Sequence, residues 1–307
     1  MAGLLAPFPY AGGKSAIAGA IWARFGEVPN YVEPLCGSAA VLLSRPHVPR
    51  TETINDADGF VANCYRAIQA DPDAVAAWAS WPVSESDLHA RHAWLVTQRE
   101  GLTAQLEGDP EFYDSHIAGW WLWGACCWIG SGWCSGEGPW RVEDGKLVHL
   151  GNAGRGIHRQ LPHLGDAGQG IHRQLPHLGN AGQDDLLAYL EALANRLARV
   201  RITCGPWERV LGPSVTTKHG LTAVLLDPPY RDDEHSFGYV VGDSCWDGCW
   251  QWASEHGDDP LFRIVLCGYE DGREIPQGWT AVHWKARGGY GSQGQGRGRA
   301  NCAREVL

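Results

Sequence analysis

Apolar residues along the chain follow two spacings. Strand-like runs at 200–204, 221–226 and 263–267 are typical of strands in a buried parallel sheet. Helical spacing begins at Ile17, where Ser15 predicts an N-cap, recurs over residues 61–68, and is clearest over residues 186–197. Residues 279–284 and 303–307 resemble a final antiparallel pair, and we expect the second strand to be cut short by the chain end. The alternation of these runs is compatible with an α/β fold.

The run at 221–226 leads into Asp227-Pro228-Pro229-Tyr230. The prolines stop the strand because neither donates a ladder hydrogen bond. Ligands bind at the carboxyl ends of strands in open α/β sheets. The chemistry suits methylation of an exocyclic amine: Asp227 and the Pro228 carbonyl would accept its two hydrogens, while Tyr230 would stack on an extruded base. For the tetrapeptide alone, a strand-end turn with an exposed ring is an equal interpretation.

Further stretches combine turns with strand ends. Gly12-Gly13 lets the backbone approach a ligand, but residues 7–15 are not a P-loop because Phe8 stands where that motif needs glycine. Residues 31–43 predict a strand, a turn of small residues and a helix whose N-terminus favours an anionic group such as a carboxylate. About 20 residues after that turn, Asp56 stands where an acid can hold ribose hydroxyls. Asparagine and aspartate in residues 55–58 are equally typical of a helix N-cap.

Together these stretches resemble the motifs of the DNA adenine methylase family (Dam-like, D12 class, phage type), which transfers methyl from S-adenosylmethionine to adenine N6. They read Phe-Pro-Tyr-Ala-Gly-Gly-Lys from Phe8, Glu-Pro-Leu-Cys-Gly-Ser-Ala-Ala-Val from Glu33, Ile-Asn-Asp from Ile54 and Asp-Pro-Pro-Tyr from Asp227. Their order is that of the family, with a long insert before the last motif. The resemblance covers the start of the chain and the part from about residue 186 onward.

The resemblance implies a Rossmann-like methyltransferase sheet with an inserted target-recognition region. Residues 1–82 and 186–307 would form the catalytic and cofactor-binding domain, and residues 83–185 the insert. Direct transfer after base flipping is expected, without metal or a covalent enzyme intermediate, through Asp227, Pro228, Pro229 and Tyr230. The residues implied around the cofactor are Tyr10, Gly13 and Lys14 at its flank, Glu33, Pro34, Cys36, Gly37 and Ser38 around its methionine part, Asp56 at its ribose, Trp207 at its adenine, and Asp227.

Two positions depart from the family pattern. Leu35 stands where phenylalanine is usual, and Ala39 stands where a second glycine is usual. A Cβ at Ala39 would crowd the cofactor, so we expect an effect on affinity more than on activity.

The insert is rich in tryptophan and contains a tandem repeat. We interpret most tryptophans of residues 117–133 as core, with Ile117, Trp121 and Trp128 on one helix face, and Trp133 beside a glycine-rich turn as a DNA contact. The sequence of residues 151–164 recurs at 165–178 and begins again at 179–183. Its arginines make it a candidate DNA-reading loop, and a solvent-exposed loop is the alternative. These arginines are Arg155, Arg159 and Arg173.

Charge is unevenly distributed. The formal net charge of −10 argues against general adhesion to nucleic acid. Residues 227–274 hold 12 acidic and 3 basic residues, whereas residues 285–304 hold basic residues and no acid. In that glycine-rich loop, Arg287, Arg297 and Arg299 are candidate contacts to the DNA backbone, or parts of a flexible linker. The 10 cysteines have neither disulfide nor zinc spacing, and no apolar stretch reaches the ~18 residues of a membrane span.

We therefore expect S-adenosylmethionine as cofactor, double-stranded DNA as partner, and a monomer or weak dimer without membrane or metal. With no signal peptide, the expected location is the cytoplasm of a bacterium or of a phage-infected host cell. A restriction-modification role or a solitary phage enzyme would fit. Three alternatives stay open: cytosine N4 or RNA adenine as the target, an inactive DNA-binding relative, and an unrelated ATP-binding enzyme that uses Gly13-Lys14-Ser15.

Overall fold

A five-stranded parallel sheet forms the centre of the computed structural model, with strand order β5-β2-β1-β6-β7. The strands are β1 (Asn30–Glu33), β2 (Thr51–Asp56), β5 (Val200–Cys204), β6 (Thr222–Leu226) and β7 (Phe262–Leu266). The structure describes residues 4–10, 12–128, 133–134, 140–143, 146–149, 181–229, 245–269, 272–284 and 305–307. The predicted α/β class is confirmed, and the architecture is consistent with a Rossmann-like methyltransferase fold.

The direction of strand order reverses beside β1. From β1 the chain extends through β2 to β5 on one side of the sheet, while β6 and β7 lie on the other side. Val32 pairs with both Thr53 of β2 and Val224 of β6, so the carboxyl ends of these three strands lie side by side. Such a reversal point is where open α/β sheets bind their ligands.

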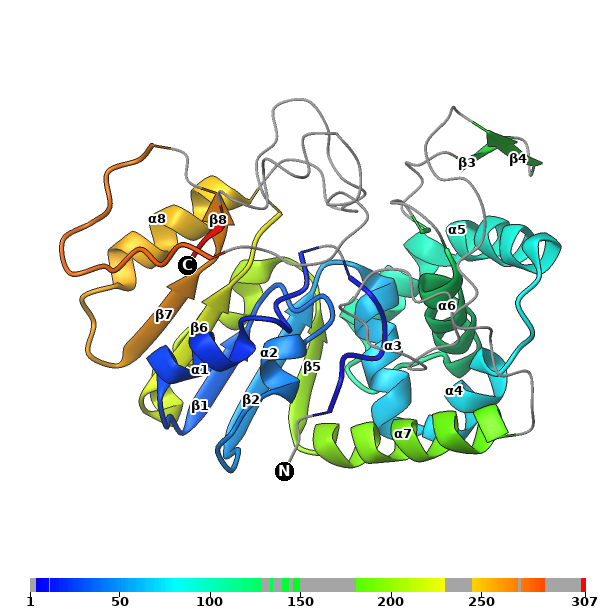
Figure 1. The fold of residues 1–307 in the computed structure, drawn as a ribbon, viewed down its shortest axis with the longest axis horizontal. Helices are drawn as coiled ribbons and strands as arrows, with labels where there is room; N and C mark the ends of the chain where they lie inside the picture. The colour runs from blue at the N-terminus through cyan, green and yellow to red at the C-terminus, as the bar shows by residue number, and fades with distance from the viewer. Residues whose placement is uncertain are drawn as a thin grey trace.

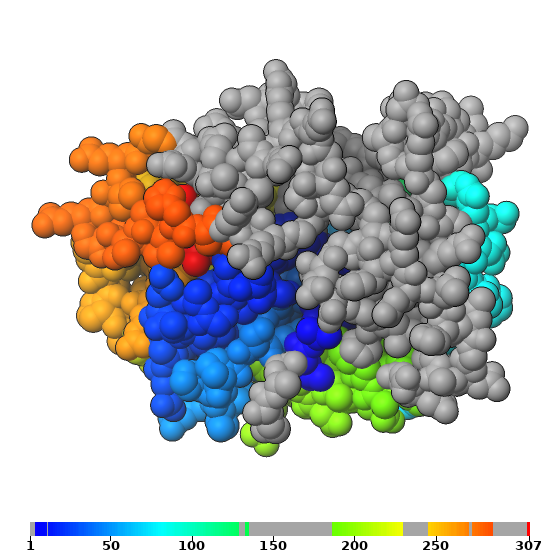
Figure 2. Space-filling model, viewed as in Figure 1, coloured from blue at the N-terminus to red at the C-terminus, as the bar shows by residue number. Residues whose placement is uncertain are grey.

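Helices cover both faces of the sheet. On one face, α1 (Ala18–Phe25), α2 (Ala40–Leu43) and α3 (Gly59–Ala70) share a buried apolar cluster with Tyr31 and Ile54. On the other face, α8 (Trp246–His256) packs in a second cluster with Val32 and Val224. In Figure 1 the sheet lies on the left of the view, and α3, α4, α5, α6 and α7 lie to the right of the sheet. In the space-filling view, the N-terminal segment and α1 lie between the 262–284 region and α7 (Figure 2).

The start of α1 differs from the prediction. Residues 15–17 form a turn in which the Ile17 amide donates to the Lys14 carbonyl at 3.1 Å. The helix therefore begins at Ala18, with Ile17 at the N-cap and no side-chain cap. The prediction of Ser15 as the cap is wrong, because the tight turn at Lys14 delays the first helical residue.

The remaining helices form a layer beside β5. They are α4 (Pro72–Ala79), α5 (Glu85–Gly108), α6 (Ser115–Cys127) and α7 (Ala181–Leu197). Side-chain caps begin α4, α5 and α6, from Asp71, Ser84 and Asp114 respectively. Leu95 of α5 and Trp123 of α6 are fully buried in the same cluster as α3. Residues 85–127 thus pack as part of this helical layer, and the domain division at residues 82 and 186 stays a prediction.

Tryptophans of this layer are mainly core residues. Trp121, Trp123 and Trp128 are buried, which confirms that interpretation for them. Helix α6 ends at Cys127, so Trp128 lies just past the helix that carries Ile117 and Trp121. A helix that is apolar on nearly every side requires burial all round, and α6 obtains it between α3, α4 and α5.

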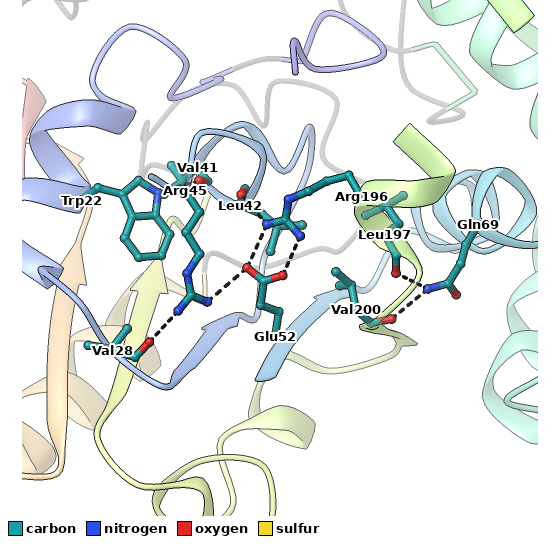
Figure 3. Close-up of polar contacts among 10 residues, drawn as sticks. All are labelled: Trp22, Val28, Val41, Leu42, Arg45, Glu52, Gln69, Arg196, Leu197 and Val200. Carbon is teal, nitrogen blue, oxygen red and sulfur yellow. Dashed lines mark hydrogen bonds and ion pairs between the residues drawn. The ribbon is translucent and has the colours of Figure 1, made fainter. Parts of the chain in front are cut away.

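A buried ion-pair network joins α7 to the amino end of β2 (Figure 3). The Glu52 carboxylate, only 2% exposed, lies 2.6 Å from Arg196 Nη1 and 3.1 Å from Arg45 Nη1. Arg45 also donates to the Val28 carbonyl and lies over the ring of Trp22. Because a buried carboxylate is costly unless it is paired, the two guanidinium groups stabilise Glu52 and fix α7 against the sheet.

The described strands outside the central sheet form two short antiparallel pairs, and two 3₁₀ helices, η1 (Trp207–Val210) and η2 (Thr217–His219), lie between β5 and β6. The pairs are β3 (Trp140–Glu143) with β4 (Lys146–His149), and β8 (Gly268–Tyr269) with β9 (Glu305–Val306). The predicted strand at 303–307 is confirmed at residues 305–306. No regular strand forms over residues 279–284, but this segment does pair antiparallel with the chain end: His283 bridges Val306, and Val282 and Leu307 exchange two backbone hydrogen bonds of 3.0 Å.

Candidate active site

Three carboxyl side chains come from the ends of adjacent strands. Glu33 ends β1, Asp56 ends β2, and Asp227 directly follows β6. Glu33 pairs with Ile54, and Tyr31 pairs with Ala223, so strand alternation places all three carboxyl groups on the face of Tyr31. The sheet therefore gathers these separately predicted residues on one face, at the point where strand order reverses.

The N-terminal motif reaches this group of acids through Lys14. Its ammonium lies 2.8 Å from Asp227 Oδ1 and donates to the Gly12 carbonyl at 2.6 Å. The Lys14 side chain is 3% exposed and that of Asp227 20%. A pair shielded from solvent in this way is stronger than a surface ion pair. The sequence predicted Lys14 at the cofactor flank and gave no signal of its contact with Asp227 of the Asp-Pro-Pro-Tyr motif.

Tyr10 packs directly on the loop that follows β1. Gly37 has a φ of 45°, and a Cβ built there would lie 2.5 Å from the Tyr10 ring. At Gly13 an added Cβ would lie 3.2 Å from the Tyr10 carbonyl oxygen and 3.7 Å from Ser38 Oγ. Position 37 thus needs glycine for two independent reasons, its left-handed backbone and the ring above it.

Ala39, where the family usually has glycine, also has a left-handed backbone. Its φ is 49° and its ψ is 29°, and the residue is fully buried at the N-cap of α2. For a residue with a Cβ this conformation costs about 1–2 kcal/mol. Alanine in place of glycine at position 39 therefore strains the backbone even before any ligand is bound.

Glu33 is a buried carboxyl group that holds a proton at neutral pH. Burial raises the pKa of Glu33 to about 8, and the nearby Asp227 adds to this effect. The Tyr31 hydroxyl donates to Glu33 Oε2 at 2.9 Å, which opposes the rise. A cation placed beside Glu33 would favour its ionised form. The site is therefore suited to a positively charged ligand.

Asp56 and Asp58 lie in different surroundings, and the structure shows one of the two roles predicted for this segment, the helix cap. Asp58 caps α3 by accepting from the Phe60 amide at 3.0 Å. Asp56 accepts from the amides of Gly37 and Asp58, each at 2.9 Å. Burial raises the pKa of Asp56 to about 7, and the neighbouring Asp58 adds to the rise. The contact with a ribose stays a prediction for Asp56.

Asn55 holds together the loops around the candidate site, a role that the sequence did not predict beyond a possible helix cap. Its Nδ2 donates to the carbonyls of Pro34 and Gly205, both at 2.9 Å, and its Oδ1 accepts from the Thr203 hydroxyl at 2.9 Å. These bonds join the loops that follow β1 and β5 to the end of β2. The buried amide next to Asp56 thus fixes the spacing of the three strand ends.

The other predicted residues lie in different surroundings. Trp207 opens the 3₁₀ helix η1 (Trp207–Val210) after β5, and its ring approaches Gly248 of α8. Trp133 donates its indole N–H to the Trp121 carbonyl at 3.0 Å and packs on Gly124 and His92, so its described contacts are within the protein. Pro228 is buried and Pro229 half-buried. Tyr230 and the six candidate DNA-binding arginines, Arg155, Arg159, Arg173, Arg287, Arg297 and Arg299, lie outside the described residues.

Within the described ranges, no helix has the length and apolar character needed to cross a membrane. Nor does that part of the chain bring together three or more histidine, cysteine, aspartate or glutamate side chains suited to a metal ion. The described cysteines are all free thiols, and all but Cys245 are buried.

Residues 10–91 match the family model of the D12 class N6 adenine-specific DNA methyltransferases. This match confirms the family resemblance and contains Lys14, Glu33 and Asp56, whereas Asp227 lies beyond its end. A comparison with curated proteins found no match.

Proposed function

We propose that this chain, whose residues 10–91 match the D12 class of adenine-specific DNA methyltransferases, transfers a methyl group from S-adenosylmethionine to adenine N6 in DNA. The observation that carries the proposal is the contact of Lys14 with Asp227. It joins the matched region to the acid of the Asp-Pro-Pro-Tyr motif, which the match itself does not include.

The residues at the strand ends fit this cofactor. Its sulfonium and ammonium groups are cations, and Glu33 is a buried carboxyl group beside Asp227 that a cation would ionise. At Gly37 the missing Cβ makes room for the Tyr10 ring, and at Gly13 for the Tyr10 carbonyl, so the N-terminal motif packs directly on the loop that would hold the cofactor. When bound, S-adenosylmethionine supplies an activated methyl group. Glu33 and the Gly37 loop would hold its methionine part, and Asp56 its ribose.

Asp227 would act on the amine of the target base. The lone pair of adenine N6 is delocalised into the ring, and a carboxylate that accepts an N–H makes the nitrogen a better nucleophile. As N6 gains the methyl group it loses one proton, for which the Asp227 carboxylate is the adjacent acceptor. Lys14 holds that carboxylate in place before the base arrives, so orientation contributes to the rate. The Pro228 carbonyl and the Tyr230 ring would complete the amine and base contacts.

The proposal extends to the rest of the chain through double-stranded DNA as substrate. Residues 83–185 would carry target recognition, with Arg155, Arg159 and Arg173 near base edges, while Arg287, Arg297 and Arg299 would contact the backbone. Replacing a backbone-contacting arginine should reduce the slope of affinity against salt by about one unit. Replacing a base-reading arginine should instead relax sequence preference.

The decisive experiment is methyl transfer from labelled S-adenosylmethionine to unmethylated duplex DNA, followed by nucleoside analysis. We expect label in N6-methyladenine, and none with Asp227→Asn, although that variant still binds cofactor. Asp258→Asn, the same change at an exposed acid, is the matched control. Label in N4-methylcytosine would change the target base. Cofactor binding without transfer to DNA or RNA would instead favour an inactive binding protein.

A further inference from the structure

Two buried glutamates lie on neighbouring strands of the sheet and differ in their partners. Glu52 of β2 is paired with the guanidinium groups of Arg45 and Arg196. Glu33 of β1 is buried to a similar degree, yet in the described part of the chain no lysine or arginine forms an ion pair with it. Because a buried carboxylate needs a cation beside it, Glu33 is the acid with which a cationic ligand would pair.

The Tyr31 hydroxyl fixes the orientation of the Glu33 carboxyl group. The two residues are two positions apart on β1, so their side chains share one face, and the hydroxyl donates to Glu33 Oε2 at 2.9 Å. The fully buried Tyr31 ring packs against Trp22 and Phe25, with ring centres 5.0 and 6.0 Å away. Burial raises the pKa of Tyr31 well above its ordinary value, so the hydroxyl remains a donor at neutral pH. Such a bond is stronger to a carboxylate than to a protonated acid, so Tyr31 favours the form that pairs with a cation.

Titratable groups surround Glu33 from each neighbouring element, and none of them neutralises it. They are Tyr31 on β1, Glu52 on β2, Asp227 after β6 with Lys14 bonded to it, Cys36 in the loop after β1, and Tyr65 on α3. Burial raises the pKa of both the Cys36 thiol and the Tyr65 hydroxyl, so these two are neutral. The two acids oppose a charge on Glu33, while a backbone hydrogen bond from Leu42 favours it. Glu33 therefore has to lose a proton when a cation pairs with it.

We propose that Tyr31 is a positioning residue that holds the Glu33 carboxyl group for the ammonium end of the cofactor, and that cofactor binding displaces the proton of Glu33. The inference rests on the proposed function. The O–H bond of Glu33 breaks, its proton passes to the solvent, and the carboxylate pairs with the ammonium group while it keeps the bond from Tyr31. Cofactor affinity should then rise with pH, by up to about tenfold per unit, until an α-amino group loses its own proton at about 7.7–8.0.

The test counts protons with two non-reacting probes. S-adenosylhomocysteine carries the ammonium group, whereas 5′-methylthioadenosine keeps the adenine and the ribose but lacks the amino-acid part. Calorimetry at pH 7, in two buffers of different ionisation enthalpy, gives the protons released by each probe. We expect S-adenosylhomocysteine to release about 0.5–1 proton more than methylthioadenosine. A proton released from Asp56 by the ribose is common to both probes and cancels in the difference.

Three variants assign the effect to Tyr31 and Glu33. Tyr31→Phe removes only the hydroxyl and should weaken S-adenosylhomocysteine about tenfold, with little change for methylthioadenosine. Its KM for S-adenosylmethionine should rise more than its kcat falls. Glu33→Gln should abolish the difference in proton release. Tyr65→Phe is the matched control, because it removes a buried tyrosine hydroxyl that makes no hydrogen bond within the described residues, and it should change neither affinity.

The outcomes separate this inference from the proposed function. Equal weakening of both probes by Tyr31→Phe would give Tyr31 a purely structural role and overturn the inference. Equal proton release by both probes in the unaltered protein also overturns it, even if Tyr31→Phe fails to fold, and leaves methyl transfer intact. If the unaltered protein binds neither probe, the proposed function fails first.

Discussion

Lys14 Nζ lies 2.8 Å from Asp227 Oδ1 and joins the first and last of the four sequence motifs. The two residues meet because β1 and β6 are neighbours in the sheet and the N-terminal segment packs over the face that carries Asp227. An ammonium group buried on the proposed catalytic carboxylate gives that carboxylate a fixed position and a fixed charge environment.

Replacing Lys14 by methionine should therefore affect methyl transfer more than cofactor binding. We expect the single-turnover rate to fall on the order of 100-fold, comparable to losing one preorganised electrostatic contact. The cofactor dissociation constant should change by much less. Lys14→Arg, which keeps the charge, is the control and should retain part of the rate. The opposite pattern, weak cofactor binding with an unaltered rate, would make Lys14 a cofactor ligand instead.

Replacing Ala39 by glycine should stabilise the protein. The change relieves a left-handed conformation but adds freedom to the unfolded chain, so the expected net gain is about 0.5–1 kcal/mol. The reverse change, Gly37→Ala, serves as the control. It introduces both a strained backbone and a clash with the Tyr10 ring, and should destabilise the protein by about 1–3 kcal/mol. Urea unfolding measures both. Equal stability of Ala39→Gly and the unaltered protein would show that the local backbone has relaxed.

Stability without cofactor should fall as pH rises through neutrality. Folded Glu33 keeps its proton up to a pKa of about 8, whereas its ordinary value is 4.5. Between these two pH values the folded state therefore binds more protons than the unfolded state. Each such group lowers the free energy of unfolding by up to about 1.4 kcal/mol for each unit of rising pH. Asp56 contributes in the same direction from 3.8 up to its pKa of about 7.

The interval above pH 7 depends mainly on Glu33. Urea unfolding between pH 7 and 8 should show a downward slope in the unaltered protein and lose most of it in Glu33→Gln, because Asp56, with a pKa of about 7, gives up its remaining proton early in this interval. Below pH 7 the variant should keep the slope that Asp56 causes. The same slope in both proteins above pH 7 would contradict this assignment of the buried proton.

Replacing Glu52 by glutamine should destabilise the fold without removing the chemistry. Arg45 and Arg196 would lose their common counter-charge in a buried setting, which typically costs about 3–5 kcal/mol. Glu27→Gln removes the same charge from an exposed position in the turn before β1 and should have little effect. Thermal unfolding compares the two variants. Loss of methyl transfer by folded Glu52→Gln at low temperature would show that the network also supports the site.

Many of the elements, and the residue types of the candidate site, could be predicted from the order of amino acids alone. Continuous apolar runs predicted β5, β6 and β7, because a strand covered on both faces is apolar at every position. Helical spacing predicted α3 and α7, because a helix that buries one face repeats its apolar residues about every 3.6 positions. The motifs also singled out Lys14, Glu33, Asp56 and Asp227. Such assignments depend on neighbours in the chain and on the chemistry of each side chain.

Which of these residues meet could not be predicted in this way, because it depends on how the chain folds in three dimensions. Strand order brings Glu33, Asp56 and Asp227 to one face, and the fold places Lys14 on Asp227 and Asn55 between the ends of three strands. The raised pKa of Glu33 arises from burial, and the strain at Ala39 from a backbone angle, neither of which is visible in residue order. Contacts between distant segments depend on packing of the whole core, so no local pattern of apolar and polar residues specifies them.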